Sequence, residues 1–301
     1  MAPLTPDAQA IVAAHQDLAL PLAGQPALHY TRDDAVYRAA KQACLALGFV
    51  EIDAECLGLA WQAMVQRTGR FDPQAWPDEP ADFGMRPWPR NDAFAPCPKA
   101  LGLYAVLPDA AWVGRMARAG VPTVQLRFKS DDADAIRHEV QAAVEAVSGT
   151  PSLLFINDHW QAAIEAGAYG VHLGQEDMDV ADLAAIRAAG QRLGLSSHGY
   201  AEMLRADRVS PSYIAMGAVF PTTLKRMATA PQGTGRLHAY ARLMRDYPLV
   251  AIGGIDGKKM PQVLSSGVGS VAVVRAITGV DNPEAAVAQL QSQMTAPHTP
   301  S

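Results

Sequence analysis

The sequence contains few cysteines, no excess of positive charge and no long hydrophobic run, and each lack excludes a class of protein. Three cysteines (Cys44, Cys56 and Cys97) are too few and too unevenly spaced for a disulfide framework or a zinc site, which favours a reducing compartment. A net charge of −5 without a basic stripe argues against a nucleic-acid binder. No apolar run approaches the roughly 20 residues of a membrane span, and the N-terminus lacks a secretory pattern. We therefore expect a cytoplasmic protein without nucleic-acid or membrane partners.

The chain divides near residue 100. With 301 residues, 49% of them hydrophobic, it can bury one large core and a smaller appendage. Residues 71–100 carry repeated prolines among tryptophans, which predicts an irregular connector packed along a surface. Two earlier segments, Asp33–Gly48 and Asp53–Gly69, have an Asp near the start, apolar residues at helical spacing and a terminal Gly. Residues 1–70 are therefore predicted to form a small, mainly helical region of unknown role, in which residues 1–24 carry no assignable pattern.

From residue 101 to residue 297, apolar β-rich runs alternate with alanine-rich amphipathic segments. The eight runs are Gly102–Leu107, Thr123–Arg127, Ser152–Ile156, Gly170–Leu173, Arg192–Ser196, Tyr213–Ala218, Leu249–Gly253 and Ser270–Val274. Eight strand–helix units in about 200 residues match a closed (β/α)8 TIM barrel of the α/β class, with an open doubly wound sheet as the alternative. Polar residues end nearly every run, which favours the barrel because barrels carry their chemistry on that face.

Carboxylates follow two consecutive predicted strands. Asp158 comes after the third strand and Asp177 after the fourth, and Trp160–Gly167 between them is typical of a short helix that Asp158 would cap. Strand, helix and strand make a parallel pair, so both carboxylates should emerge at the same edge of the sheet. Hard oxygen ligands there suit Mg²⁺, which uses one or two protein carboxylates together with water and substrate phosphates. The alternative is that Asp158 only caps the helix.

The second strand carries Gln125, Arg127 and Lys129 in alternation. Positions i, i+2 and i+4 of a strand share one face, so the three side chains should converge near the barrel rim. A guanidinium and an ammonium together suit a diphosphate. The alternative is a solvated edge strand, which the apolar residues between them disfavour.

Three further strand ends carry weaker signals. Ser196-Ser197-His198 could bind a heterocycle or orient a leaving group, although a capping serine and a structural histidine explain it equally well. Phe220–Arg226 starts a long loop that could close over an anion, or else is a flexible basic loop. Gly253-Gly254 and Val274-Arg275 follow the last two strands, where many barrels bind phosphate through backbone N–H groups.

These motifs together resemble the thiamine-phosphate synthase family, over roughly two thirds of the chain from Leu101 to Gln293. The motifs, in family order, are Gln125-Leu126-Arg127-Phe128-Lys129, Asn157-Asp158, Gly174-Gln175-Glu176-Asp177, Leu195-Ser196-Ser197-His198, Pro221-Thr222-Thr223-Leu224-Lys225 and Gly253-Gly254-Ile255. The resemblance implies a transferase that condenses 4-amino-2-methyl-5-hydroxymethylpyrimidine diphosphate with a plain or carboxylated thiazole phosphate, giving thiamine phosphate and diphosphate. It implies no protein nucleophile, because the thiazole nitrogen attacks a pyrimidine methylene cation.

The resemblance also implies roles for individual residues. Mg²⁺ at Asp158 and Asp177 would neutralise the departing diphosphate. The implied catalytic residues are Arg127, Lys129, Ser196 and Lys225. Gln125, Asn157 and Ser196 would hold the pyrimidine diphosphate, while Thr222 and Gly254 would hold the thiazole phosphate. The remaining implied substrate contacts are Leu126, Phe128, Thr223, Leu224, Val274 and Arg275.

Two positions depart from the family pattern. Leu224 replaces a second Thr or Ser, and Arg275 stands where a Ser usually follows the last strand. A lost hydroxyl bond to an ionised phosphate costs roughly 1.5–3 kcal/mol, and a guanidinium can return a contact of similar size. Our hypothesis is that Arg275 binds the thiazole phosphate, the alternative being an Arg paired with a local acid.

Three alternative functions remain open at this stage. A thiazole tautomerase-like paralogue would need no diphosphate site, which the residues Gln125, Arg127 and Lys129 argue against. A non-catalytic sensor of thiamine intermediates would bind ligand without Mg²⁺-dependent turnover. A fused pyrimidine kinase in the N-terminal region is disfavoured by its small size and its lack of a Gly-rich phosphate loop. Family members are often oligomeric, so a homo-oligomer is a further expectation.

Overall fold

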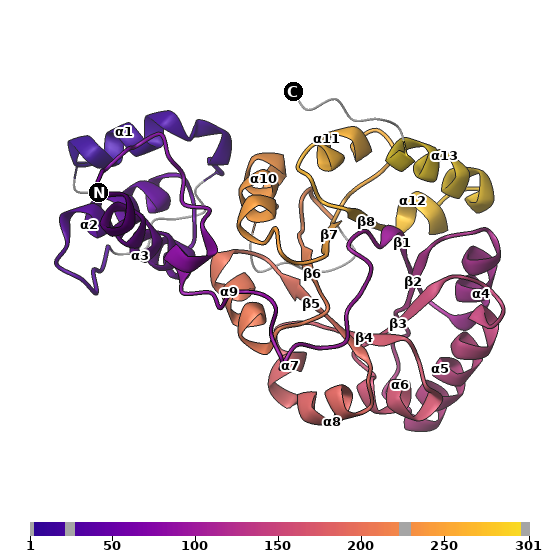
Figure 1. Ribbon diagram of the computed structural model, residues 1–301. Coiled ribbons are helices and arrows are strands. Elements are labelled where there is room, and N and C mark those ends of the chain that lie inside the picture. Colours follow the sequence, from indigo (N-terminus) through magenta and orange to yellow (C-terminus); the bar gives the residue numbers. More distant parts are fainter. Residues whose placement is uncertain (1–2, 22–27, 223–229, 296–301) are drawn as a thin grey trace.

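Eight parallel strands form a closed barrel in the computed structural model, which describes residues 3–21, 28–222 and 230–295 (Figure 1). The strands follow one another in chain order around the barrel, and β8 closes it by pairing with β1. They are β1 (Gly102–Leu107), β2 (Thr123–Leu126), β3 (Leu153–Asn157), β4 (Gly170–Leu173), β5 (Arg192–Ser197), β6 (Tyr213–Met216), β7 (Leu249–Ile252) and β8 (Ser270–Val273). The predicted TIM barrel is confirmed, and the closed strand order excludes the open doubly wound sheet.

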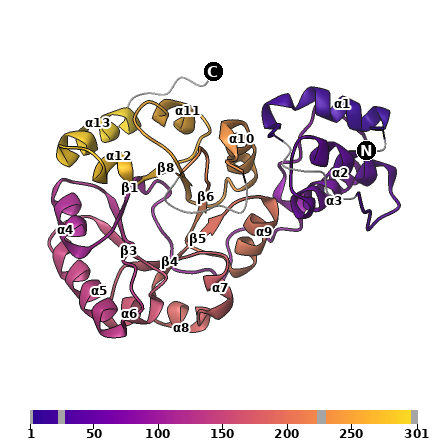
Figure 2. The ribbon, with the colours of Figure 1, turned by 180° about the vertical axis from the view of Figure 1, so that it is seen from behind.

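Helices alternate with the strands and surround the barrel (Figures 1 and 2). They are α4 (Ala110–Arg118), α5 (Ala133–Val147), α6 (Trp160–Ala166), α7 (Asp177–Val180), α8 (Leu183–Ala188), α9 (Tyr200–Val209), α10 (Gly233–Leu243), α11 (Met260–Leu264), α12 (Arg275–Thr278) and α13 (Pro283–Thr295). Asp109, Asp132 and Asp182 cap α4, α5 and α8 by accepting hydrogen bonds from backbone N–H groups of the first turn. None of the helices within the described ranges is long and apolar enough to cross a membrane.

Aromatic side chains fill the barrel interior. Tyr104, Phe155 and Tyr213 pack against one another there, with ring centroids 5.1–6.0 Å apart. Glycines in neighbouring strands make the room, because a Cβ at Gly194 would lie 2.1 Å from the Tyr213 ring and one at Gly170 would lie 2.6 Å from Phe155. The barrel is therefore packed through its centre, and substrate chemistry is confined to its rim.

The N-terminal region is helical and lies beside α9 and α10 (Figures 1 and 2). It contains α1 (Pro6–Ala14), a short 3-10 turn η1 (Gln16–Leu18), α2 (Ala35–Ala46) and α3 (Glu51–Thr68). The sequence pattern predicted α2 and α3 but not α1, although Thr5 and Pro6 at its start are a helix-initiation signal. Helix α3 begins two residues before Asp53, so Asp53 sits in the first turn and does not cap its own helix.

The connector, residues 71–100, is irregular apart from one 3-10 turn, η2 (Pro80–Phe83). It runs along the amino ends of the strands: the Phe94 N–H donates to the Ser210 carbonyl, 3.0 Å away, and the Ser212 hydroxyl donates to the Ala95 carbonyl, 2.6 Å away. The guanidinium of Arg90 forms a buried ion pair with Asp207 at 2.7 Å. The connector therefore covers the end of the barrel opposite to the rim that carries the predicted site.

Candidate active site

A chain of hydrogen bonds links residues of six strands, β1 to β6, through the barrel interior. Gln125 Nε2 donates to Asn157 Oδ1 at 2.8 Å, and Gln125 Oε1 accepts from the Tyr104 hydroxyl at 2.8 Å. The hydroxyls of Tyr104 and Tyr213 are 2.8 Å apart. His172 completes the chain, with Nδ1 2.7 Å from the Tyr213 hydroxyl and Nε2 2.8 Å from Ser196 Oγ. The chain therefore joins Asn157 and Gln125 on one side of the rim to Ser196 on the other.

Counting donors fixes the direction of this chain. The Tyr104 hydroxyl donates to Gln125, so its oxygen accepts from Tyr213, and the Tyr213 oxygen then accepts from a protonated Nδ1 of His172. In a neutral imidazole, Nε2 then accepts the hydroxyl proton of Ser196. Burial raises the pKa of both phenols well above the ordinary range, so both remain donors. The Ser196 oxygen is thereby left with its lone pairs available to a substrate donor.

Sequence reasoning did not assign roles to Tyr104, Tyr213 and His172. Each is a polar side chain inside an otherwise apolar strand, which is the signal that could have identified them. An isolated tyrosine in such a run is also an ordinary core residue. Only the closure of the barrel brings the three together.

Asp158 and Asp177 lie together at the ends of β3 and β4. Loss of hydration and the neighbouring charge of Asp177 raise the pKa of Asp158 to about 6. Asp177 is oriented by the Gly174 N–H, which donates to its Oδ2 at 3.0 Å. Two adjacent carboxyl groups fit a Mg²⁺ ion, whose charge would favour the ionised form of Asp158. No cluster of three or more potential His, Cys or acidic ligands occurs in the part of the chain that the structure describes, which is compatible with a Mg²⁺ that takes only two carboxylates.

The prediction that Asp158 caps the following helix is wrong. Helix α6 begins at Trp160, with His159 at the cap position and no side-chain cap bond. Asp158 adopts a left-handed backbone conformation, with φ of 64°, and its N–H donates to the His172 carbonyl at 3.0 Å. This backbone turn directs the residue toward β4 instead of along α6.

Arg127 and Lys129 lie beyond the end of β2, which stops at Leu126. The predicted strand alternation therefore does not extend to them, although the Arg127 N–H still donates to the Leu107 carbonyl at 2.8 Å. Arg127 is half-buried, and its charge acts to lower the pKa of Asp158. Lys129 is exposed. Within the described residues, neither side chain has a hydrogen-bond or ion-pair partner, so both cations remain available to an anion.

The β7 loop packs tightly against the loop that follows β6. Gly254 has φ of 64°, and a Cβ there would lie 2.5 Å from the Pro221 carbonyl oxygen, so only glycine fits. Lys259 Nζ donates to the Gly254 carbonyl at 2.6 Å and fixes the turn. Thr222, which directly follows Pro221, is half-buried. Thr223, Leu224 and Lys225 lie outside the described residues.

The other predicted contacts fall at the same rim. Leu126 is buried among the helices outside the barrel, so its backbone is the part that faces the site. Phe128 and Val274 are half-buried. Arg275, at the start of α12, is exposed and has no ion-pair partner among the described residues, so the alternative of an Arg paired with a local acid has no support there.

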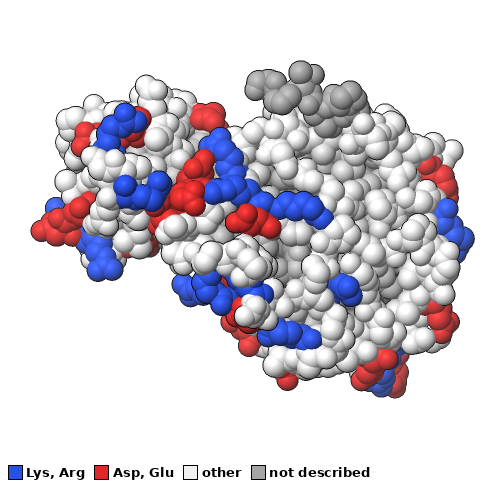
Figure 3. Space-filling model, viewed as in Figure 1, with Lys and Arg blue, Asp and Glu red and all other residues white. Residues whose placement is uncertain are grey.

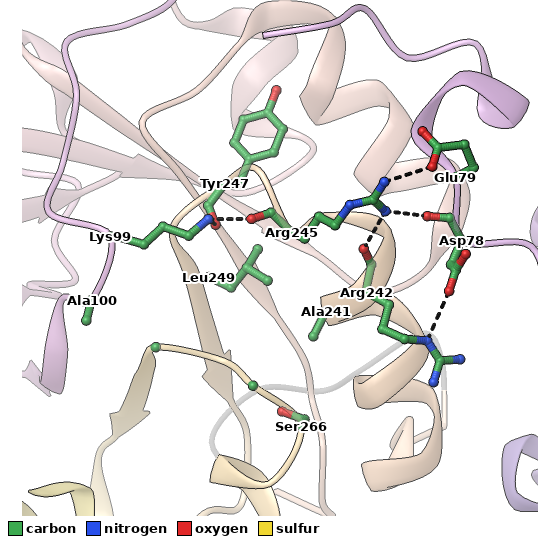
Figure 4. A pocket seen from close by; sticks show the side chains of 12 residues that line it. Asp78, Glu79, Lys99, Ala100, Ala241, Arg242, Arg245, Tyr247, Leu249 and Ser266 are labelled. Atoms are coloured by element: carbon green, nitrogen blue, oxygen red, sulfur yellow. Dashed lines mark hydrogen bonds and ion pairs between the residues drawn. The ribbon is translucent and has the colours of Figure 1, made fainter. Parts of the chain in front are cut away.

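A separate cavity of about 540 Å³ lies at the amino end of the barrel (Figure 4). Its basic residues already have partners. Lys99 donates to the carbonyls of Arg245 and Tyr247, and Arg245 pairs with Glu79 at 2.9 Å. Arg242 pairs with Asp78 at 3.3 Å. This cavity is therefore a seam between the connector and the barrel, far from the carboxyl-end residues described above.

Comparison with known proteins decides the family. A family model described as thiamine monophosphate synthase matches residues 103–277, more than half of the chain. The chain belongs to the thiamine-phosphate synthase family. The thiamine-phosphate synthase of Neisseria meningitidis serogroup B is 57% identical over 199 residues, which cover 66% of this chain and 97% of that protein. The thiamine-phosphate synthase of Yersinia pestis (strain Pestoides F) is 50% identical over 190 residues, which cover 63% of this chain and 88% of that protein.

Among solved structures, the thiamine phosphate pyrophosphorylase from Pyrococcus furiosus superposes with a TM-score of 0.58 at 27% identity, covering 64% of this chain and 95% of that one. The family and enzyme class predicted from the motifs are confirmed: this thiamine-phosphate synthase is a transferase of thiamine biosynthesis. The family match begins at residue 103, so the N-terminal helices and the connector lie outside it.

Proposed function

We propose that this thiamine-phosphate synthase condenses the pyrimidine diphosphate with a thiazole phosphate at the carboxyl-end rim of the barrel, with Mg²⁺ as its cofactor. The observation that carries the proposal is the pairing of Asp158 and Asp177 beside Arg127, a cation with no hydrogen-bond partner in the described chain. A metal held by two carboxylates, next to unpaired cations, suits a diphosphate leaving group. A tautomerase has no need for this combination.

Leaving-group stabilisation is the main catalytic task. Mg²⁺ bound by Asp158 and Asp177 would supply positive charge to the departing diphosphate oxygens. Arg127 and Lys129 add charge-assisted hydrogen bonds to the same group, and Lys225 by family position does so from the loop after β6. The thiazole nitrogen then attacks the pyrimidine methylene cation, so no side chain acts as nucleophile.

The hydrogen-bonded chain orients the pyrimidine. Gln125 and Asn157 fix each other through the 2.8 Å bond between their amides, and Ser196 is fixed by His172. All three polar groups are thus held in place before substrate arrives, which reduces the entropic cost of aligning the ring. We assign Gln125, Asn157 and Ser196, with Leu126 and Phe128 flanking, to the pyrimidine diphosphate.

The thiazole phosphate is assigned to the loops after β6, β7 and β8. The residues proposed to contact it are Thr222, Thr223, Leu224, Gly254, Val274 and Arg275. Glycine at position 254 lets backbone N–H groups approach the phosphate closely. Arg275 supplies a guanidinium in place of the hydroxyl groups that the family usually has at positions 224 and 275.

The test is diphosphate release and thiamine phosphate formation from both substrates, with and without Mg²⁺. Turnover that requires the metal supports the proposal. Isomerisation of the thiazole without any pyrimidine substrate would indicate a tautomerase, and binding of both substrates without diphosphate release would indicate a sensor. Gel filtration with light scattering checks the expected homo-oligomer.

We also propose three units in the chain: a helical region (1–70), a connector (71–100) and the catalytic barrel (101–297). Contacts at residue 100 support the last boundary, because the chain there passes from the amino-end seam into β1. The low cysteine content supports a cytoplasmic location, and the net charge supports small-molecule partners over nucleic acid.

A further inference from the structure

Helix α9 is capped by a residue of the N-terminal region. Gly199 occupies the cap position and offers no side chain, and the helix has no side-chain cap of its own. Asp53 of α3 takes this role: its Oδ1 accepts from the Ala201 N–H at 2.8 Å, across 148 residues of sequence. Asp53 is only 5% exposed, so this contact is buried. The first hundred residues therefore complete a helix of the barrel.

The fit at this contact is close. A Cβ at Gly199 would lie 2.1 Å from Asp53 Oδ2, so glycine is required for the carboxylate to reach the helix end. Tyr200, the next residue, accepts a hydrogen bond from Trp76 Nε1 at 2.9 Å and stacks on Phe83 with ring centroids 5.6 Å apart. Buried polar contacts of this kind are costly to break, which indicates a permanent interface.

Helix α9 in turn holds two parts of the candidate active site. Its Glu202 accepts from the backbone N–H of His198 at 2.8 Å and lies 2.6 Å from the His198 ring, which fixes the segment directly after Ser196. Its Arg205 donates to the Gln175 carbonyl at 2.8 Å and pairs with Asp179, on either side of Asp177. A shift of α9 would therefore displace both Ser196, proposed to bind the pyrimidine diphosphate, and Asp177, proposed to bind Mg²⁺.

The same segments are also linked directly. Gln175 Nε2 donates to the Ser196 carbonyl at 2.7 Å, so the loop that carries Asp177 and the strand end that carries Ser196 move together. A second contact of the N-terminal region is made with α10. Arg236 of α10 donates to the carbonyls of Leu18 and Leu47 at 2.9 and 3.0 Å.

We propose that Asp53 is a positioning residue for catalysis, and that the N-terminal region acts through α9 to set the placement of Ser196 and Asp177. This gives the N-terminal region a role in the reaction of the barrel without an activity of its own. The inference rests on the proposed assignment of Ser196 to the pyrimidine diphosphate and of Asp177 to Mg²⁺.

The test compares Asp53→Ala and Asp53→Asn in the full-length enzyme. Loss of a buried hydrogen bond to a charged group corresponds to roughly a tenfold change in a binding constant. For Asp53→Ala we expect a rise of about that size in the KM for the pyrimidine diphosphate and in the Mg²⁺ concentration for half-maximal rate, with the KM for thiazole phosphate within about twofold. Asp53→Asn should restore part of the effect, because its amide oxygen can still accept from Ala201.

The matched control is Asp34→Ala. Asp34 caps α2 within the same N-terminal region, with its Oδ1 2.9 Å from the Tyr37 N–H, and neither residue belongs to the α9 contact. This variant should leave all three constants unchanged. If Asp53→Ala lowers only the amount of active enzyme and leaves both KM values and the Mg²⁺ requirement unchanged, Asp53 is merely structural and the proposal is wrong.

A second variant approaches the contact from the barrel side. Gly199→Ala forces its Cβ against the Asp53 carboxylate and should give the same pattern of changes, which keeps the proposal testable even if Asp53→Ala does not fold. In an Asp53→Ala background the added Cβ has room, so the double variant should be no worse than the single ones. Strict additivity of the two changes contradicts the proposal.

Ser196→Ala separates this inference from the assignment beneath it. If Ser196→Ala leaves the KM for the pyrimidine diphosphate unchanged, the site assignment fails. If Ser196→Ala raises that KM and Asp53→Ala does not, the site stands and the positioning role fails.

Discussion

His172 Nε2 lies 2.8 Å from Ser196 Oγ, while its Nδ1 lies 2.7 Å from the hydroxyl of Tyr213. The imidazole therefore connects the hydroxyl of Ser196, which we propose faces the pyrimidine diphosphate, to a phenol in the packed interior of the barrel. Such a connection makes the orientation of Ser196 depend on buried residues that no substrate reaches.

The Tyr213→Phe variant tests that dependence. It removes the hydroxyl that joins His172 to Tyr104 and leaves the tautomer of His172 unfixed. A lost buried hydrogen bond is worth about 1–3 kcal/mol, so we expect kcat/KM for the pyrimidine diphosphate to fall by roughly tenfold or more. Steady-state kinetics with each substrate varied in turn measures this.

Tyr247→Phe is its control. Tyr247 is also buried, and its hydroxyl lies 2.8 Å from Asp207 at the amino end of the barrel. The two variants should lose similar stability, and only Tyr213→Phe should lose activity. Equal losses of kcat/KM would show that general destabilisation, and not the chain through His172, is responsible.

The Asp158→Asn variant should change stability and activity in opposite directions. Loss of hydration and the charge of Asp177 raise the pKa of Asp158 to about 6, so the carboxylate that is ionised at neutral pH destabilises the folded protein without metal. Asparagine removes that repulsion and tolerates the left-handed backbone, with φ of 64°. Without Mg²⁺ we expect a higher melting temperature than that of the native enzyme.

With Mg²⁺ the order should reverse. The native enzyme gains stability on binding the metal, whereas the variant has lost one ligand and gains less. Its turnover should need a higher Mg²⁺ concentration. Thermal melts across a Mg²⁺ titration, paired with rate measurements, check both statements. A variant with unchanged metal dependence would remove Asp158 from the metal site.

The sequence predicted the elements of the barrel well because each depends on a local pattern. Alternating apolar runs and capped amphipathic segments appear within ten to twenty residues of chain. The strand ends followed from the same pattern, and they pointed to Asp158, Asp177, Gln125 and Ser196 as candidates for one rim. The error at Asp158 arose because an Asp before a helix usually caps it, and nothing in the sequence signals a left-handed turn there.

The contacts between residues far apart in the chain could not be predicted from the sequence. Tyr104 and Tyr213 are 109 residues apart, and only barrel closure brings their hydroxyls within 2.8 Å. Asp53 is spaced like an ordinary helix-start residue, yet its carboxylate serves α9. Arg236 is likewise a helical residue whose partners, Leu18 and Leu47, are backbone carbonyls that carry no side-chain signal.

The Arg275→Ala variant tests the proposed replacement in the thiazole-phosphate pocket. Loss of a charge-assisted contact to phosphate is worth about 1.5–3 kcal/mol, so we expect the KM for thiazole phosphate to rise at least about tenfold. The KM for the pyrimidine diphosphate should not change. Arg115→Ala is the control. Arg115 forms an exposed ion pair with Glu284, with 2.6 Å between the two charged groups, and this pair lies away from the site. An unchanged KM for thiazole phosphate in Arg275→Ala removes Arg275 from the pocket.

The buried carboxyl of Asp53 gives the interface a signature in the pH dependence of stability. Burial raises the pKa of Asp53 to about 6 in the folded protein. The Ala201 N–H and the charge of Arg236 act to lower this pKa, and the charge of Glu202 acts to raise it. The unfolded chain has the ordinary value, so between about pH 4 and pH 6 the folded state binds the extra proton. The contribution of Asp53 to the free energy of unfolding therefore falls as the pH rises through this window, by up to about 1.4 kcal/mol per pH unit. Asp53→Asn cannot titrate, and its melting temperature relative to the native enzyme should increase from pH 4 to pH 6. A constant difference between the two melting curves over that range is incompatible with a raised pKa at Asp53.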